Sequence, residues 1–151
     1  MRRTPIQPKP EMADARKEGL LNIGEAAAAS GVSAKSIRHY EASGLMPAAK
    51  RTFANYRLYS QADIHTLRFI KSARSLGFSI ADIGKLVQLW HNQQRSSRDV
   101  KDLALQQVAE LEARISEMQR MCNTLKQLAT HCHGDARPDC PILEDLASHC
   151  C

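Results

Sequence analysis

Residues 98–130 contain neither glycine nor proline, and this uninterrupted stretch limits what the chain can fold into. Along it, apolar side chains recur at alternating intervals of four and three residues. They are Ala104, Val108, Leu111, Ile115, Met118, Cys122, Leu125 and Ala129, which we call the seam. The pattern predicts one long helix whose apolar stripe runs for roughly 37 Å. Because the rest of a 151-residue chain cannot cover the whole stripe, we expect a second copy to pack against it in a symmetric homodimer.

Residues 23–41 are predicted to form two short helices joined by a tight turn. Ser30-Gly31 ends the first helix, because glycine readily adopts the left-handed conformation that such a turn requires. Ser33 is a suitable N-cap for the second helix, which extends to about Glu41 with Ile37 facing inward.

A hairpin and two further helices are predicted between this helix pair and the long helix. Residues 56–59 alternate as a strand would, and Asn55 suits the hairpin tip because Asn tolerates a positive φ. Ser60 and Ser79 each stand three positions before an aspartate, which is a variant of the helix-capping box. They open helices that extend to about Ser75 and Trp90.

Charge and cysteine are unevenly distributed along the chain. Residues 1–75 carry 13 Lys or Arg against 6 Asp or Glu, whereas residues 76–151 carry 8 against 10. A basic front half favours a polyanionic partner, although a solvated basic surface would give the same count. All five cysteines lie between Cys122 and Cys151, which in a reducing compartment favours metal or redox chemistry.

The chain shows no membrane or export signal. Its longest apolar stretches fall short of the roughly 20 residues that span a bilayer, and residues 1–20 lack the apolar run of a signal peptide. We therefore expect a cytoplasmic protein, with no membrane partner, whose thiols stay reduced.

The predicted helix pair and hairpin together favour DNA binding. Lys35 and Arg38 lie near the start of the second helix, and the hairpin contains Tyr56 and Arg57. Two basic elements of this kind suit a recognition helix in the major groove and a wing that contacts backbone phosphates.

Five short motifs then follow one another in a specific order within residues 21–147. They are Ile23-Gly24-Glu25-Ala26-Ala27, Ser36-Ile37-Arg38-His39-Tyr40-Glu41, Gly44-Leu45, Asn55-Tyr56-Arg57-Leu58-Tyr59 and Leu76-Gly77-Phe78-Ser79. This order resembles the MerR family of bacterial metal- and stress-responsive transcription regulators, which usually have Gly where Asn55 stands. The resemblance implies a mainly α fold, with a winged helix-turn-helix, an antiparallel two-helix coiled coil in the dimer and a C-terminal effector loop.

The motifs and the helix pattern together divide the chain into four segments. We expect a flexible N-terminal arm (1–20), a winged helix-turn-helix DNA-binding domain (21–92), a dimerisation helix (93–130), and a metal-binding loop with a C-terminal tail (131–151).

The resemblance also implies how such a protein works. Lys35, Arg38 and Tyr40 of the recognition helix, and Tyr56 and Arg57 of the wing, are expected to contact double-stranded promoter DNA. The dimer binds with or without metal, and metal shifts it to a conformation that bends and untwists the promoter so that bacterial RNA polymerase can engage.

The effector is expected to be a metal bound by Cys132 and Cys140, eight positions apart across a Gly- and Pro-containing loop. Their continuation, Pro141-Ile142-Leu143, resembles that of the copper-efflux regulators. Two thiolates suit a soft monovalent ion that accepts linear coordination, which favours Cu(I), with Ag(I) or Au(I) as mimics, over the four-coordinate Zn²⁺. By resemblance, Ser97 stands where divalent-ion members carry a cysteine that reaches over from the partner subunit, but Ser97 or Ser96 also suits a helix cap.

Other interpretations of these residues remain open. His131 and His133 could complete a Zn²⁺ site with Cys140, and Cys150-Cys151 with His149 could capture or transfer metal. The chain could be a Zn²⁺ or Hg²⁺ sensor of the same family, or a cytosolic copper buffer or chaperone that uses the same thiols without DNA. The sequence shows no residue set for catalysis, so we do not expect an enzyme.

Overall fold

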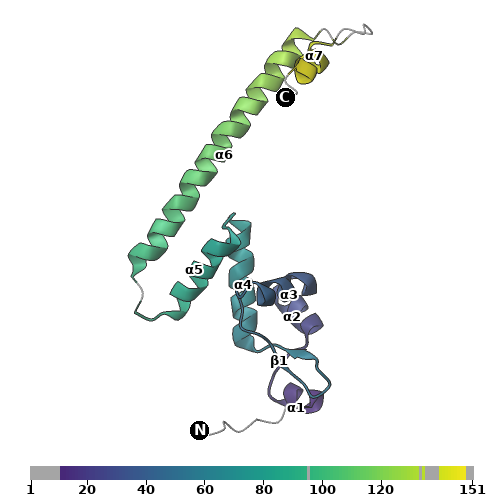
Figure 1. Ribbon diagram of the computed structural model, residues 1–151, viewed down its shortest axis with the longest axis vertical. Coiled ribbons are helices and arrows are strands. Elements are labelled where there is room, and N and C mark those ends of the chain that lie inside the picture. Colours follow the sequence, from purple (N-terminus) through teal and green to yellow (C-terminus); the bar gives the residue numbers. More distant parts are fainter. Residues whose placement is uncertain (1–10, 95, 133, 135–139, 149–151) are drawn as a thin grey trace. The chain divides into compact units, whose positions relative to one another are not determined.

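The computed structural model describes residues 11–94, 96–132, 134 and 140–148, and it divides into two compact units. These are the N-terminal unit (Met1–Lys101) and the C-terminal unit (Asp102–Cys151). The described elements are α1 (Met12–Lys17), α2 (Ile23–Ser30), α3 (Ala34–Ala42), β1 (Lys50–Arg51), β2 (Arg57–Leu58), α4 (Gln61–Ser75), α5 (Ile80–His91), α6 (Ser97–His131) and α7 (Pro141–Ser148) (Figure 1). The mainly helical fold class is therefore confirmed. Within the described residues, no helix combines the length and the apolar character needed to cross a membrane.

Helices α2 and α3 form the predicted helix-turn-helix. Asn22 caps α2, and its side chain and that of Glu25 exchange hydrogen bonds of 2.9 Å with each other's backbone N–H groups. Gly31 follows α2 with φ of 70°, the left-handed conformation that a residue with a Cβ adopts only at a cost. Ser33 caps α3 by accepting the N–H of Ser36 at 3.1 Å.

The predicted hairpin is present and short. β1 and β2 pair antiparallel, with Lys50 opposite Leu58 and Arg51 opposite Arg57. Asn55 has φ of 68°, the positive value expected at the tip. An isolated bridge between Leu21 and Tyr59 ties the end of the hairpin to the segment before α2.

Helices α4 and α5 complete the N-terminal unit. Ser60 and Ser79 cap them as predicted, and Phe69 of α4 stacks on Trp90 of α5 with ring centroids 4.7 Å apart. Apolar side chains from α2, α3, α4, α5 and the hairpin meet in one core. Its fully buried members include Ala26, Ile37, Tyr59, Ile64, Leu67, Ile70 and Ile83.

Helix α1 corrects part of the expected flexible arm. Residues 12–17 are helical, and Ala15 is completely buried. The N–H of Leu20 donates to the Ala15 carbonyl at 2.9 Å, and Arg16 forms an ion pair of 3.6 Å with Glu25. The prolines of this segment suggested a flexible arm, but all of them precede residue 11. The following residues, Met12–Lys17, have a composition that supports a helix. Residues 1–10 lie outside the described part of the chain.

Helix α6 extends over 35 residues, close to the predicted range, and α7 follows it as an eight-residue helix. The seam is open to solvent in the single chain: Val108 is 47% exposed, Ile115 61% and Leu125 55%. α7 likewise exposes Leu143 and Leu146. Both helices thus carry apolar side chains that this chain alone leaves uncovered.

Candidate functional site

The outer face of α3 presents the basic residues that were predicted to contact DNA. Lys35 and Arg38 are exposed, whereas Ile37 between them is buried in the core. Tyr40 is half-buried and packs against the core. Its backbone carbonyl accepts the N–H of Leu45 at 3.0 Å. Lys35 and Arg38 are therefore the more accessible part of this set, and Tyr40 also has a structural role.

The two wing residues have different surroundings. Tyr56 is 61% exposed, so its ring is accessible to a partner. The Arg57 Nε donates to the Glu41 carboxylate at 2.9 Å, in an ion pair whose side chains are 30% and 10% exposed respectively. Arg57 therefore holds the hairpin against α3, while its half-exposed side chain stays within reach of a partner.

Glu41 connects α3 to the hairpin, and sequence reasoning missed this role. Besides Arg57, its carboxylate accepts the backbone N–H of Ala49 at 3.1 Å and the hydroxyl of Tyr59 at 3.2 Å. These donors lie 8, 16 and 18 residues along the chain, too far for any local pattern to reveal. The Glu41 carboxylate thus joins the last turn of the recognition helix to the start and end of the hairpin.

The surroundings of Tyr59 change the pKa of its phenol. Burial raises the pKa of its phenol to about 12, and the negative charge and hydrogen bond of Glu41 act in the same direction. The phenol therefore stays protonated at every physiological pH and remains a donor to Glu41. The Tyr59 hydroxyl thus supplies one of the hydrogen bonds that join the hairpin to α3.

The two predicted metal-binding thiols lie at neighbouring helix ends. Cys132 directly follows α6, where its N–H donates to the carbonyls of Leu128 and Ala129 at 3.2 Å. Cys140 precedes Pro141, and its carbonyl accepts the N–H of Glu144 at 3.1 Å, so it occupies the N-cap position of α7. Both cysteines are half-buried and free. The two thiols thus stand at the end of α6 and at the start of α7, the two helices that flank residues 133–139 in the sequence.

Ser97 is the first residue of α6, whereas Cys132 follows the last one. Within one chain, the structure therefore does not bring the predicted selectivity residue to the thiols. Ser97 is exposed, and the neighbouring Ser96 accepts the N–H of Arg98 at 3.1 Å, so Ser96 supplies the cap.

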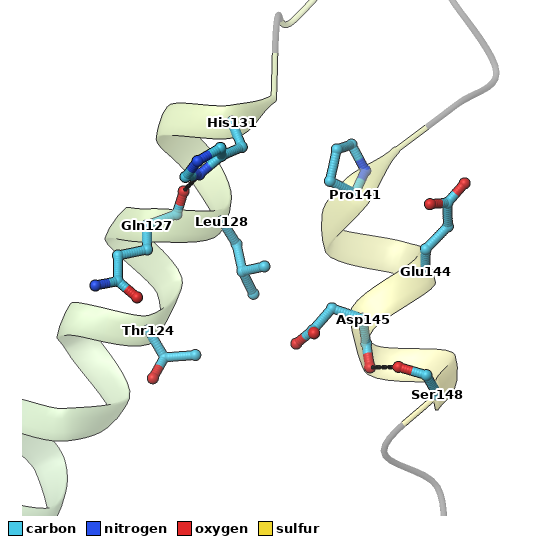
Figure 2. Close-up of a pocket in the computed structure, with 8 residues that line it drawn as sticks. All are labelled: Thr124, Gln127, Leu128, His131, Pro141, Glu144, Asp145 and Ser148. Carbon is cyan, nitrogen blue, oxygen red and sulfur yellow. Dashed lines mark hydrogen bonds between the residues drawn. The ribbon is translucent and has the colours of Figure 1, made fainter.

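An open groove of about 860 Å³ lies between α7 and the end of α6. Thr124, Gln127, Leu128 and His131 line it from α6, and Pro141, Glu144, Asp145 and Ser148 line it from α7 (Figure 2). The His131 Nδ1 lies 2.6 Å from the Gln127 carbonyl oxygen, which restrains the ring on its own helix. No group of three or more His, Cys, Asp or Glu side chains suited to a metal occurs among the described residues. His133, Cys150 and Cys151 lie outside them.

Two family descriptions match the chain and together cover most of it. "MerR HTH family regulatory protein" matches residues 21–90, and "MerR, DNA binding" matches residues 64–128. The chain belongs to the MerR family. MerR members are DNA-binding transcription regulators and not enzymes, which agrees with the fold and with the basic face of α3.

Named relatives narrow the kind of MerR regulator that the chain resembles. The HTH-type transcriptional regulator HmrR of Sinorhizobium medicae is 56% identical over 84% of this chain and 86% of the relative. Heavy metal-dependent transcription regulator 2 of Rhizobium meliloti is 55% identical over 85% and 87%. The crystal structure of the regulator PbrR691 from Ralstonia metallidurans, in complex with lead(II), has a TM-score of 0.73 at 25% identity and covers 83% of this chain and 98% of that one.

Proposed function

We propose that this MerR-family protein is a metal-responsive transcription regulator whose effector is Cu(I), with Ag(I) or Au(I) as mimics. It acts in the cytoplasm as a homodimer on promoter DNA and activates genes for copper efflux or detoxification through RNA polymerase. Metal responsiveness is supported by a relative named as heavy metal-dependent at 55% identity. The finer assignment to Cu(I) depends on the thiols of this chain.

The observation that carries the Cu(I) assignment is the donor set at the α6–α7 junction. Cys132 and Cys140 are free thiols at the two helix ends, and the described residues add no third or fourth ligand beside them. Thiolates favour soft ions, and a set of two suits a monovalent ion better than one that needs a full shell. Cys132 and Cys140 would hold the metal through their thiolates, one at the end of α6 and one at the start of α7.

Discrimination against divalent ions is proposed to depend on Ser97. Because Ser97 and the thiols of one chain stand at opposite ends of α6, only the partner subunit can bring a Ser97 to them, as the family resemblance implies. A hydroxyl there offers no third thiolate. A divalent sensor remains the main alternative, since PbrR691 was crystallised with lead(II). Substituting Ser97→Cys should therefore admit a response to divalent ions.

The dimer is proposed from the uncovered seam of α6. Exposed side chains recur along it at heptad spacing from Val108 to Leu125. Burying such a stripe against an identical antiparallel helix removes it from water, at about 25 cal/mol per Å² of apolar surface. A two-fold dimer would also present two recognition helices to a near-palindromic site.

Metal binding and DNA binding together test this proposal. We expect the wild-type protein to bind one Cu(I) per chain in competition with a chromophoric Cu(I) chelator, and to retain promoter binding in a mobility-shift assay. Cys132→Ser and Cys140→Ser should each lose the Cu(I) site while promoter binding persists. The exposed Cys122, which lies on the seam, provides the matched control: Cys122→Ser should keep the full Cu(I) stoichiometry.

Two results would contradict this assignment. Undiminished Cu(I) binding by the double variant would place the metal elsewhere, with Cys150-Cys151 as the next candidate. Cu(I) binding without any promoter binding would instead indicate a copper buffer or chaperone.

A further inference from the structure

Phe53 stands at the tip of the hairpin with 85% of its surface exposed, more than any other large apolar side chain that the structure describes. Exposed single hydrophobic residues are common on protein surfaces and need no explanation by themselves. Phe53 differs from such isolated residues in two ways. A hydrogen-bonded turn presents it to solvent, and a second exposed aromatic residue, Tyr56, lies three residues away.

Backbone and side-chain hydrogen bonds fix the turn that carries Phe53. The N–H of Asn55 donates to the Thr52 carbonyl at 2.9 Å, and the N–H of Thr52 donates to the Tyr56 carbonyl at 2.9 Å. The Thr52 hydroxyl, which is buried, accepts the N–H of Tyr56 at 3.0 Å. The Arg51 guanidinium closes the turn on the carbonyl of Asn55 at 3.2 Å. The backbone that presents Phe53 is therefore already ordered, so a partner that covers the ring needs to fix only the side chain.

The charges around Phe53 select the kind of partner. Lys50 and Arg51 on β1 and Arg57 on β2 are basic, and described acidic side chains are absent from the 50–59 hairpin segment. The Glu41 carboxylate on α3 accepts hydrogen bonds from Ala49, next to this segment, and from Arg57 within it, so the hairpin that carries Phe53 is held beside α3. A basic surface beside a DNA-reading helix fits a polyanion.

Duplex DNA offers an apolar surface as well as phosphates. Apolar side chains contact the sugar edges and base steps of the minor groove, whereas Lys and Arg neutralise the backbone. We propose that Phe53 makes a non-ionic contact with the minor-groove edge of the promoter duplex, next to the major-groove site of α3. This inference rests on the DNA-binding role of the protein and adds an apolar contact to the ionic ones.

The salt dependence of DNA affinity separates these two kinds of contact. The probe is a duplex selected by the wild-type protein from a random-sequence library, and binding is measured between 50 and 300 mM salt, a range of about sixfold. Phe53→Ala should lower affinity by about tenfold with the slope of log K against log salt unchanged, because no phosphate contact is lost. Lys50→Gln should lower affinity and reduce the slope by about one.

Matched variants control for folding and for general loss of apolar surface. Phe53→Tyr should restore most of the affinity, and Leu76→Ala, whose side chain is 61% exposed outside the hairpin, should bind as the wild type does. The melting temperature of Phe53→Ala should not change, since the side chain packs on almost nothing.

Four outcomes overturn the proposal. Affinity of Phe53→Ala within twofold of wild type at every salt concentration overturns the contact, as does a loss accompanied by the same slope change as in Lys50→Gln. Unchanged DNA affinity with lost transcription would place a protein partner on Phe53 instead. A wild-type protein that selects no duplex overturns the DNA-binding role together with the contact.

Discussion

Substitution of Glu41 tests whether α3 and the hairpin are held together as one unit. The Glu41 side chain is 10% exposed, and its carboxylate accepts three hydrogen bonds, one of them in the ion pair with Arg57. Surface ion pairs contribute about 0–1 kcal/mol and broken buried ones cost about 3–5 kcal/mol. The free-energy contribution of the Glu41–Arg57 ion pair should lie between these limits, because the Arg57 side chain is 30% exposed. We expect Glu41→Ala to lower the free energy of unfolding by about 2–4 kcal/mol, and Glu41→Gln, which keeps an acceptor for Tyr59, by about 1–2 kcal/mol.

Urea unfolding measures both variants, and a double-mutant cycle with Arg57→Met isolates the ion pair. We expect a coupling free energy of about 1–2 kcal/mol. Lys85→Gln is the matched control: it breaks the exposed ion pair between Lys85 and Asp82, 3.0 Å long, which should contribute less than about 0.5 kcal/mol. DNA affinity should fall in Glu41→Gln although Glu41 itself carries no positive charge. A coupling below about 0.3 kcal/mol, together with unchanged DNA affinity, would refute the idea that this carboxylate positions the wing.

Three further predictions concern the dimer, the buried phenol and the recognition helix. Leu111→Asp with Ile115→Asp should convert dimer to monomer or unfold the chain, because each charge would lose its water at the interface; a folded dimer by light scattering would show that α6 packs elsewhere. The free energy of unfolding should fall by about 2 kcal/mol between pH 10 and pH 12, because the folded state holds the Tyr59 proton up to about 12 while the unfolded state releases it near 10. Tyr59→Phe should lack this extra decrease, and identical pH profiles would count against the raised pKa. Arg38→Ala should weaken binding to a selected duplex by about 1–3 kcal/mol if it reads a base edge, and unchanged binding in a mobility-shift assay would remove Arg38 from the interface.

Local chemistry allowed most helices to be predicted from the sequence. Ser33, Ser60 and Ser79 each satisfy free backbone N–H groups of the helix that follows, and Gly31 adopts the positive φ that ends α2. Helix α6 followed from the absence of helix breakers and from the heptad spacing. Helix α1 was missed because the prolines before residue 11 suggested a flexible arm, although Met12–Lys17 has a composition that supports a helix.

The candidate site could be predicted only in part. Lys35 and Arg38 were accessible to sequence reasoning because they lie on the exposed side of one amphipathic helix. The role of Glu41 was not, since its donors come from 8 to 18 residues away and meet only when the hairpin folds back on α3. The exposure of Phe53 likewise depends on the geometry of one turn. The roles of Cys132, Cys140 and Ser97 stay predictions, because a metal and a second chain are needed to test them.

Transcription in vitro from the target promoter, with Cu(I), Ag(I), Zn²⁺ and Hg²⁺ added separately, tests the central claim most directly. We predict activation by Cu(I) and Ag(I) but not by Zn²⁺ or Hg²⁺, and its loss in Cys132→Ser and in Cys140→Ser while both variants still bind the promoter. Ser97→Cys should gain some response to divalent ions. Activation of the wild type by Zn²⁺ or Hg²⁺ at least as strong as by Cu(I), or Cu(I) activation that survives loss of both cysteines, would contradict the account.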